Sequence, residues 1–178
     1  MSIRAILAVL LTGITLAACG AKTKPGVAAP EQLPDQESWN SRVVFSDSGQ
    51  VRAVLRARHI RMYQQRQETI IDSGLVVDFY DKQQQHTSRL TADSGRVDDA
   101  TRNLEAFGRV VFTSDSGTVV RTEYLFWENA TKMVRGNRFV TITSPTEYLQ
   151  GNGFEADQHL KNYTIFGTVS GEAEIKKR

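Results

Sequence analysis

Cysteine, proline and histidine are scarce in this chain, and the scarcity excludes several classes of protein. Its 178 residues include one cysteine, four prolines and three histidines. A single cysteine excludes a disulfide-stapled miniprotein. The apolar fraction of 40% and the charged fraction of 24% are those of an ordinary globular protein, which excludes a collagen-like or disordered chain. A formal net charge of only +2 argues against nucleic acid as the main partner.

Catalytic and metal-binding motifs are also missing from the sequence. The histidines His59, His86 and His159 stand alone, without the spacing of a zinc site. No serine lies in a GxSxG elbow, and no glycine-rich phosphate loop is present. Asp98 and Asp99 lack the spacing of a calcium loop and are typical of turns. We therefore expect no enzyme activity, no metal site and no cofactor.

The N-terminal segment has the features of a lipoprotein signal peptide. Arg4 is followed by fourteen uncharged residues, fewer than the roughly twenty that a membrane-spanning helix needs. The segment ends in Leu16-Ala17-Ala18-Cys19-Gly20, which resembles the bacterial lipobox. This resemblance implies that residues 1–18 are removed and that Cys19 becomes the lipid anchor. The alternative is an ordinary secretory signal with an incidental cysteine.

Residues 19–38 are expected to form a lipidated N-terminus and a proline-rich tether. Pro25, Pro30 and Pro34 lie in this segment, which shows no apolar periodicity. The tether would hold a single domain, residues 39–178, near a membrane surface but outside the membrane.

Short β-rich segments alternate with turn signals throughout the expected domain. The tripeptide Asp-Ser-Gly occurs four times, beginning at Asp47, Asp72, Asp93 and Asp115, and its residue types favour turns. Many short strands without alternating helices predict an antiparallel sandwich, a jelly roll or an open barrel. The predicted strands are 75–80, 88–92, 103–107, 109–113, 118–122, 124–127, 133–135, 138–143, 148–150, 153–156 and 163–166.

Five motifs in this region occur in an order that resembles a known family. They are DFYD (78–81), SRLTADSG (88–95), LEAFGRV (104–110), SGTVVRTEYLFW (116–127) and GNGFEAD (151–157). Through them the stretch from Asp72 to Gly171 resembles the LptC family, the periplasmic bridge component of lipopolysaccharide transport. The resemblance implies an all-β fold, a twisted open β-jelly roll of antiparallel strands around an apolar groove.

The same resemblance implies the partners and the location. The domain would receive lipopolysaccharide from an inner-membrane ABC transporter and pass it to a periplasmic bridge protein of similar fold, paired through strand edges. Family members usually carry an N-terminal transmembrane helix, whereas this chain has a lipobox. We expect an anchor on the periplasmic face of the inner membrane, although Gly20 after the cysteine leaves sorting to the outer membrane open.

The segment 51–63 fits two kinds of secondary structure. Val51, Val54, Leu55 and Met62 fit one face of a helix, and the local pattern slightly favours that structure. Val51, Ala53 and Leu55 also alternate with arginines, as in a strand. The family resemblance implies a strand.

The candidate lipid-binding groove consists of apolar residues that strand alternation turns inward. A twelve-carbon chain costs on the order of 10 kcal/mol to move into water, so a transported lipid needs continuous shelter. The alternative is a solid core in a structural lipoprotein that organises envelope partners without binding lipid. The groove residues are expected to be Val77, Phe79, Leu90, Leu104, Val110, Phe112, Leu125, Trp127, Val140, Ile142, Phe154 and Ile165.

Two further sets of residues are candidate binding surfaces. Arg52, Arg56 and Arg58 form a row that either is a solvated strand face or contacts glycolipid phosphates or an acidic partner. A third function, carbohydrate binding, would use an exposed aromatic row as a stacking platform. The aromatic candidates for that row are Trp39, Trp127 and Tyr148.

Overall fold

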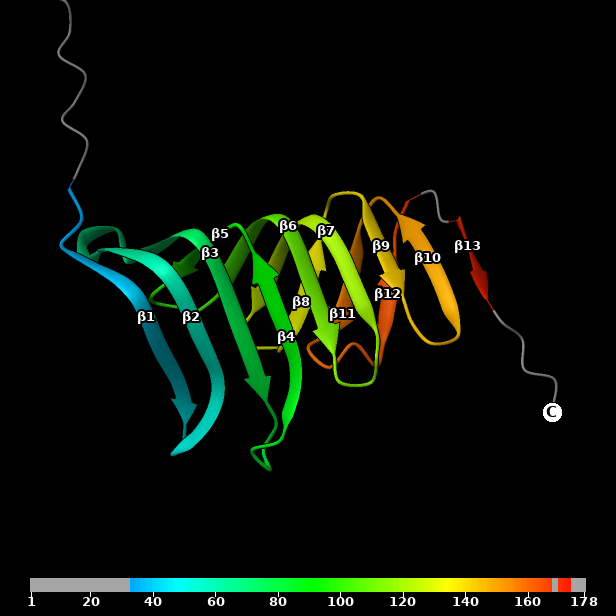
Figure 1. Ribbon diagram of the computed structural model, residues 1–178, viewed down its shortest axis with the longest axis horizontal. Helices are drawn as coiled ribbons and strands as arrows, with labels where there is room; N and C mark the ends of the chain where they lie inside the picture. Colours follow the sequence, from blue (N-terminus) through cyan, green and yellow to red (C-terminus); the bar gives the residue numbers. More distant parts are fainter. Residues whose placement is uncertain (1–32, 168–169, 174–178) are drawn as a thin grey trace, which may run out of the picture. The chain divides into compact units, whose positions relative to one another are not determined.

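The computed structural model describes residues 33–167 and 170–173. Within these ranges the chain forms one antiparallel sheet of thirteen strands and one 3₁₀ turn, η1 (Gln64–Arg66) (Figure 1). The predicted all-β jelly roll is therefore confirmed. The strands are β1 (Gln36–Asp47), β2 (Gln50–Tyr63), β3 (Glu68–Tyr80), β4 (His86–Ala92), β5 (Ser94–Asp98), β6 (Leu104–Ser114), β7 (Val119–Glu128), β8 (Met133–Gly136), β9 (Val140–Thr143), β10 (Glu147–Gly151), β11 (Phe154–Asp157), β12 (Tyr163–Ile165) and β13 (Ser170–Ala173).

The sheet is bent into two walls, because the long strands change neighbours halfway along. β3 and β6 each pair with β5 in their first half and with β4 in their second half. β7 likewise pairs first with β9 and then with β8. We call β4, β9, β10 and β13 the β4 wall, and β5, β8, β11 and β12 the β5 wall. The long strands β2, β3, β6 and β7 run through both walls (Figure 1).

Two of the four Asp-Ser-Gly tripeptides form the bend and not the turns that were predicted. Those at Asp47 and Asp115 do form the β1–β2 and β6–β7 turns. The tripeptide at Asp72 lies inside β3, and the one at Asp93 joins β4 to β5. Gly74 has a φ of +102°, a conformation that favours glycine, and its N–H donates to the Asp93 carbonyl at 2.7 Å. The β3 kink therefore lies beside the β4–β5 junction.

Bulges at the same level keep apolar side chains inside both halves of a strand. In β2 the buried interior positions change from odd numbers, Leu55 and Ala57, to an even number, Ile60. In β7 they change from even, Val120, to odd, Leu125. The neighbouring strands β3 and β6 keep their parity, but each carries one extra residue at this point, between Asp72 and Leu75 and between Phe107 and Val110. Both halves of these strands therefore face the same core. The segment 51–63 is therefore strand, and the predicted strands 118–122 and 124–127 are the two halves of β7.

The N-terminal boundary of the sheet lies before the residue that was predicted. β1 begins at Gln36, so residues 36–38, which were assigned to the tether, belong to a strand. The Asp35 N–H donates to the Met62 carbonyl at 2.8 Å, which adds one bond before the strand starts. No strand was predicted before residue 51, because the outer face of β1 is exposed and its inner face is only half-buried.

The core lies between the two walls and contains the predicted inward residues. Eleven of the twelve are at most 9% exposed, and Ile165 packs half-buried against them. Phe79 from the part of β3 beside the β4 wall contacts Trp127 from the part of β7 beside the β5 wall, with 5.3 Å between ring centroids. Phe79 also meets Phe112 edge to face at 5.8 Å. The apolar side chains of the two walls therefore pack directly against each other.

Gly136 generates a stability prediction, because it lies at the end of β8 with no room for a side chain. A Cβ there would lie 2.9 Å from the Tyr124 carbonyl oxygen and against the Phe154 ring. We expect Gly136→Ala to lower the free energy of unfolding by about 1–3 kcal/mol, measured by urea denaturation. Gly49→Asn is the control, because nothing lies within 4 Å of a Cβ at that turn and asparagine tolerates positive φ. Equal midpoints for both variants would contradict the close packing at Gly136.

Candidate functional site

A cavity of about 220 Å³ opens between the two walls at the level of the β1–β2 turn. Strand alternation supplies its apolar lining from both sides. Phe45, Ala53, Leu55, Val77 and Phe79 come from β1, β2 and β3. Val97, Leu104 and Trp127 come from β5, β6 and β7 on the opposite side. Four of the predicted groove residues, Val77, Phe79, Leu104 and Trp127, therefore line an open space.

The other eight predicted groove residues lie elsewhere in the core. Seven are at most 1% exposed, so they are packed and line no part of this cavity. They are Leu90, Val110, Phe112, Leu125, Val140, Ile142 and Phe154, with the half-buried Ile165 as the eighth.

The rim of the cavity is cationic. Arg52 from β2, Arg102 from the β5–β6 turn and Lys132 from the β7–β8 turn lie there with a single carboxylate, Asp47. The Lys132 ammonium donates to Asn129 Oδ1 at 2.7 Å and lies 5.2 Å from the centroid of the Trp127 ring. Burial lowers the pKa of Lys132 and outweighs the opposite effect of Asp47. Sequence reasoning missed Arg102 and Lys132, because turns far apart in the chain bring them together.

The predicted arginine row is divided between two surfaces. Arg52 lies at the cavity rim, where it donates to the Asp81 carbonyl at 3.1 Å and to Gln50 Oε1 at 2.8 Å. Arg56 and Arg58 instead line a hollow on the outer face of the bend. The three arginines therefore do not form one binding surface.

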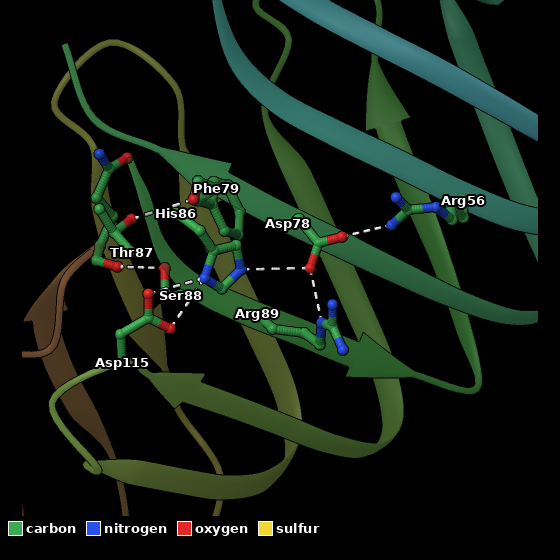
Figure 2. Close-up of polar contacts among 9 residues, drawn as sticks. Arg56, Asp78, Phe79, His86, Thr87, Ser88, Arg89 and Asp115 are labelled. Carbon is green, nitrogen blue, oxygen red and sulfur yellow. Dashed lines mark hydrogen bonds and ion pairs between the residues drawn. The ribbon is translucent and has the colours of Figure 1, made fainter. Parts of the chain in front are cut away.

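The outer face of β3 carries a buried carboxylate that the sequence did not reveal. The Asp78 side chain is only 3% exposed, and it accepts hydrogen bonds from Arg89 Nε at 2.6 Å and from Arg56 (Figure 2). His86 lies with Nε2 3.4 Å from Asp78 Oδ1 and Nδ1 2.9 Å from Asp115 Oδ1. Burial raises the pKa of Asp78, but the hydrogen bonds from Arg89 and Arg56 outweigh it, so its pKa is below the usual range. The cluster links β2, β3 and β4.

The aromatic platform expected for a carbohydrate-binding protein is not formed. Trp127 is buried, which removes it from any exposed row. Trp39 is 63% exposed and stacks on His59 at a centroid distance of 5.1 Å. Tyr148 is exposed on β10, at the opposite end of the sheet from β1. Two isolated rings at opposite ends of the sheet do not form one stacking platform for a sugar chain.

The described residues can be searched for a metal site, for a membrane-spanning helix and for the expected lipid anchor. Among residues 33–167 and 170–173, no three His, Cys, Asp or Glu side chains are grouped so that they could hold a metal ion. Within the same ranges there is no helix of the length and hydropathy required to cross a bilayer. Cys19, the predicted lipid anchor, lies outside the described residues.

The Asp78 cluster generates a pH-dependent stability prediction. Because the folded-state pKa of Asp78 lies below its unfolded value of about 3.8, its ion pairs stabilise the fold above that pH. The stabilisation is lost as the pH falls through the folded pKa. We expect Asp78→Asn to cost about 2 kcal/mol at pH 7, a figure discounted for the half-exposed arginines, and progressively less below pH 4, by urea denaturation. A pH-independent difference between wild type and variant would contradict this account.

Comparisons with known proteins agree with the two-walled sheet. Residues 4–174 match the family described as lipopolysaccharide-assembly, LptC-related. The fold is similar to the crystal structure of LptH from Pseudomonas aeruginosa, the LptA-homologous periplasmic component of the lipopolysaccharide transport device. That match has a TM-score of 0.56 and 8% identity, and covers 69% of this chain and 95% of LptH. None of the curated proteins compared with the chain matches it. Since the family match spans nearly the whole sequence, the chain belongs to the LptC-related lipopolysaccharide-assembly family.

Proposed function

We propose that this protein is a non-enzymatic periplasmic bridge that carries lipopolysaccharide between its two walls toward the outer membrane. One observation carries the proposal: the apolar interior of the sheet opens to the surface in a cavity lined from both sides. Family membership supports the assignment to lipopolysaccharide assembly. The fold similarity to LptH, a periplasmic component of a lipopolysaccharide transport device, supports a role for this jelly roll in the same kind of transport.

Loading of an acyl chain would begin at this cavity, where the two walls are already apart. Further along the interior the walls are in contact and are linked by polar bonds. Ser88 Oγ donates to the Gln158 carbonyl at 2.8 Å, and the Tyr163 hydroxyl donates to Glu147. A chain that advances from the cavity therefore has to displace the Phe79–Trp127 contact first. The two rings lose contact with each other but gain contact with the acyl chain. Apolar surface therefore stays out of water, and insertion of the chain is favourable.

Strand edges supply the proposed contacts with partners. β1 is the edge strand at one end of the sheet, and β12 and β13 are edges at the other. Their unpaired N–H and C=O groups can extend the sheet by pairing with a strand of another protein. We assign one end to the inner-membrane ABC transporter and the other to a periplasmic bridge protein of similar fold. Continuous pairing would align the apolar interiors of successive modules.

Membrane attachment completes the proposal. Cys19 would be acylated, and the chain between Cys19 and β1 would hold the sheet close to the periplasmic face of the inner membrane. Several acyl chains on one residue contribute about 0.8 kcal/mol for each buried methylene, which is enough for a stable anchor.

The alternative function is that of a structural lipoprotein with a solid core. Seven of the eight predicted groove residues that lie away from the cavity are closely packed, which favours this alternative. Such a protein would organise envelope partners through its strand edges without contacting lipid inside.

Photo-crosslinking in cells separates these two functions. A photoreactive phenylalanine analogue would be placed at Phe79, Phe112 or Trp127, whose rings lie inside, and at Arg121, which is exposed on β7. We expect lipopolysaccharide adducts at the interior positions and none at Arg121, detected by immunoblotting for lipopolysaccharide. Folding of each variant is checked by its resistance to protease. Folded, periplasmic variants without adducts at any position would favour the structural lipoprotein.

Proline substitution on β1 tests pairing through its edge. Val43 and Val44 are consecutive, so their N–H groups point to opposite sides of the strand, one toward β2 and one away. We expect one of Val43→Pro and Val44→Pro to lower the thermal midpoint by breaking a bond to β2. The other should keep the midpoint and lose co-purification with a partner, because proline blocks the free edge. Full co-purification by the variant that keeps its midpoint would contradict pairing at β1.

A further inference from the structure

The cavity has two chemically different parts. Apolar side chains from both walls form its floor, whereas Arg52, Arg102 and Lys132 stand at its rim with one carboxylate, Asp47. This arrangement matches a molecule with a hydrocarbon part and an anionic part, and it fixes which part lies deeper. A purely apolar ligand would make no ion pair with the rim cations, and a free anion would make no contact with the apolar floor.

The rim cations lack the carboxylate partners that most other cations in the sheet have. Seven other arginines form ion pairs with aspartate or glutamate, on the outer face of the sheet and along its edges; they are Arg56, Arg61, Arg66, Arg89, Arg96, Arg109 and Arg135. Among the described residues, Arg52, Arg102 and Lys132 have no carboxylate oxygen within 4.0 Å. The hydrogen bonds of Arg52 go to two neutral acceptors, the backbone carbonyl of Asp81 and the side-chain amide of Gln50. Lys132 donates to the side-chain amide of Asn129.

Lys132 is the rim cation whose position is least favourable without a ligand. It is partly buried against the Trp127 ring, and this burial lowers its pKa. Desolvation penalises a charged amine unless an anion lies beside it. An anionic group on a ligand would supply that charge and would offset the penalty.

Trp127 adds a second unsatisfied group at the same place. Its side chain lines the cavity and is 9% exposed, and its indole N–H has no acceptor among the described residues. A buried donor without an acceptor is rare in folded proteins. The Trp127 side chain therefore places a polar group without a partner in the region of the cavity.

From these observations we infer that the cavity binds a phosphate-bearing amphiphile, with the hydrocarbon chain against Phe79 and Trp127 and the phosphate on Lys132 and Arg52. The inference rests on the proposed transport function and adds the orientation of the glycolipid: chains inward, phosphate at the open side. Lys132 and Arg52 act as specificity residues for a phosphate, because a charge-assisted bond is stronger than one to a neutral headgroup. Arg52 lies on β2 and Lys132 in the β7–β8 turn, on opposite sides of the cavity, so one phosphate would bridge the opening.

Decyl phosphate is a suitable probe, with decanol and inorganic phosphate as its two halves. Trp39→Phe leaves Trp127 as the one tryptophan, so fluorescence reports on the cavity alone. In that background we expect decyl phosphate to bind at least about tenfold more tightly than either half alone. Lys132→Gln should weaken decyl phosphate about tenfold and leave decanol unchanged, since it removes one charge-assisted bond.

Two matched variants serve as controls. Lys132→Arg keeps the charge and should retain the affinity for decyl phosphate, whereas Lys82→Gln removes an exposed lysine outside the cavity and should change nothing. Equal affinities of Lys132→Gln and wild type for decyl phosphate, or binding of decanol as tight as that of decyl phosphate, would overturn the inference. If lipopolysaccharide still crosslinked at Phe79 in that case, the phosphate site would be refuted and the transport function would still be supported. A Lys132-dependent affinity without any crosslinks would refute transport and leave the phosphate site.

Discussion

The bend across the sheet is the constraint on which the rest of the structure depends. A strand side chain reverses its face at every residue, so a sheet that folds back on itself would turn the second half of each strand outward unless the register were shifted. β3 and β6 each carry one extra residue at the bend, with positive φ at Ser73 and Gly74 and at Gly108 and Arg109, while β2 and β7 change the parity of their interior positions. These local irregularities place the apolar faces of both walls on one interior. The cavity, the packed core and the free strand edges all follow from that geometry.

Sequence reasoning was most successful where alternation within a strand carries the information. It identified the inward residues, since Val77 and Phe79 keep period two irrespective of which strand lies beside them. It failed where the information lies between strands. β1 shows little apolar contrast because it is an edge, and the role of Asp78 depends on register, which sets it between Val54 and Arg89 on neighbouring strands. The bend was read as turns, because Asp-Ser-Gly favours positive φ equally in a turn and in a kink.

In the transport function that we propose, a lipid has to replace the packing that holds the two walls together. Burial of a large apolar side chain contributes roughly 1.5–3 kcal/mol, so a fully opened interior would be unstable in water. A conduit that stays closed when empty and opens ahead of an advancing chain avoids that exposure. The polar links Ser88–Gln158 and Glu147–Tyr163 resist separation further from the cavity. The walls are therefore easiest to separate at the end where the cavity already exists, which would give the proposed loading a direction.

The distribution of charge separates residues that hold the sheet together from residues that are free to bind. On the outer face Asp78 is surrounded by Arg56, Arg89 and His86, and its carboxylate is desolvated, so replacing any partner would leave a buried charge partly uncompensated. Arginines committed in this way have little capacity for a ligand. Arg52 lies on the same strand as Arg56 but ends at the cavity rim with only neutral acceptors. Its free charge, unlike that of Arg56, can respond to an anion without cost to the fold, and for that reason we place the binding role at the rim.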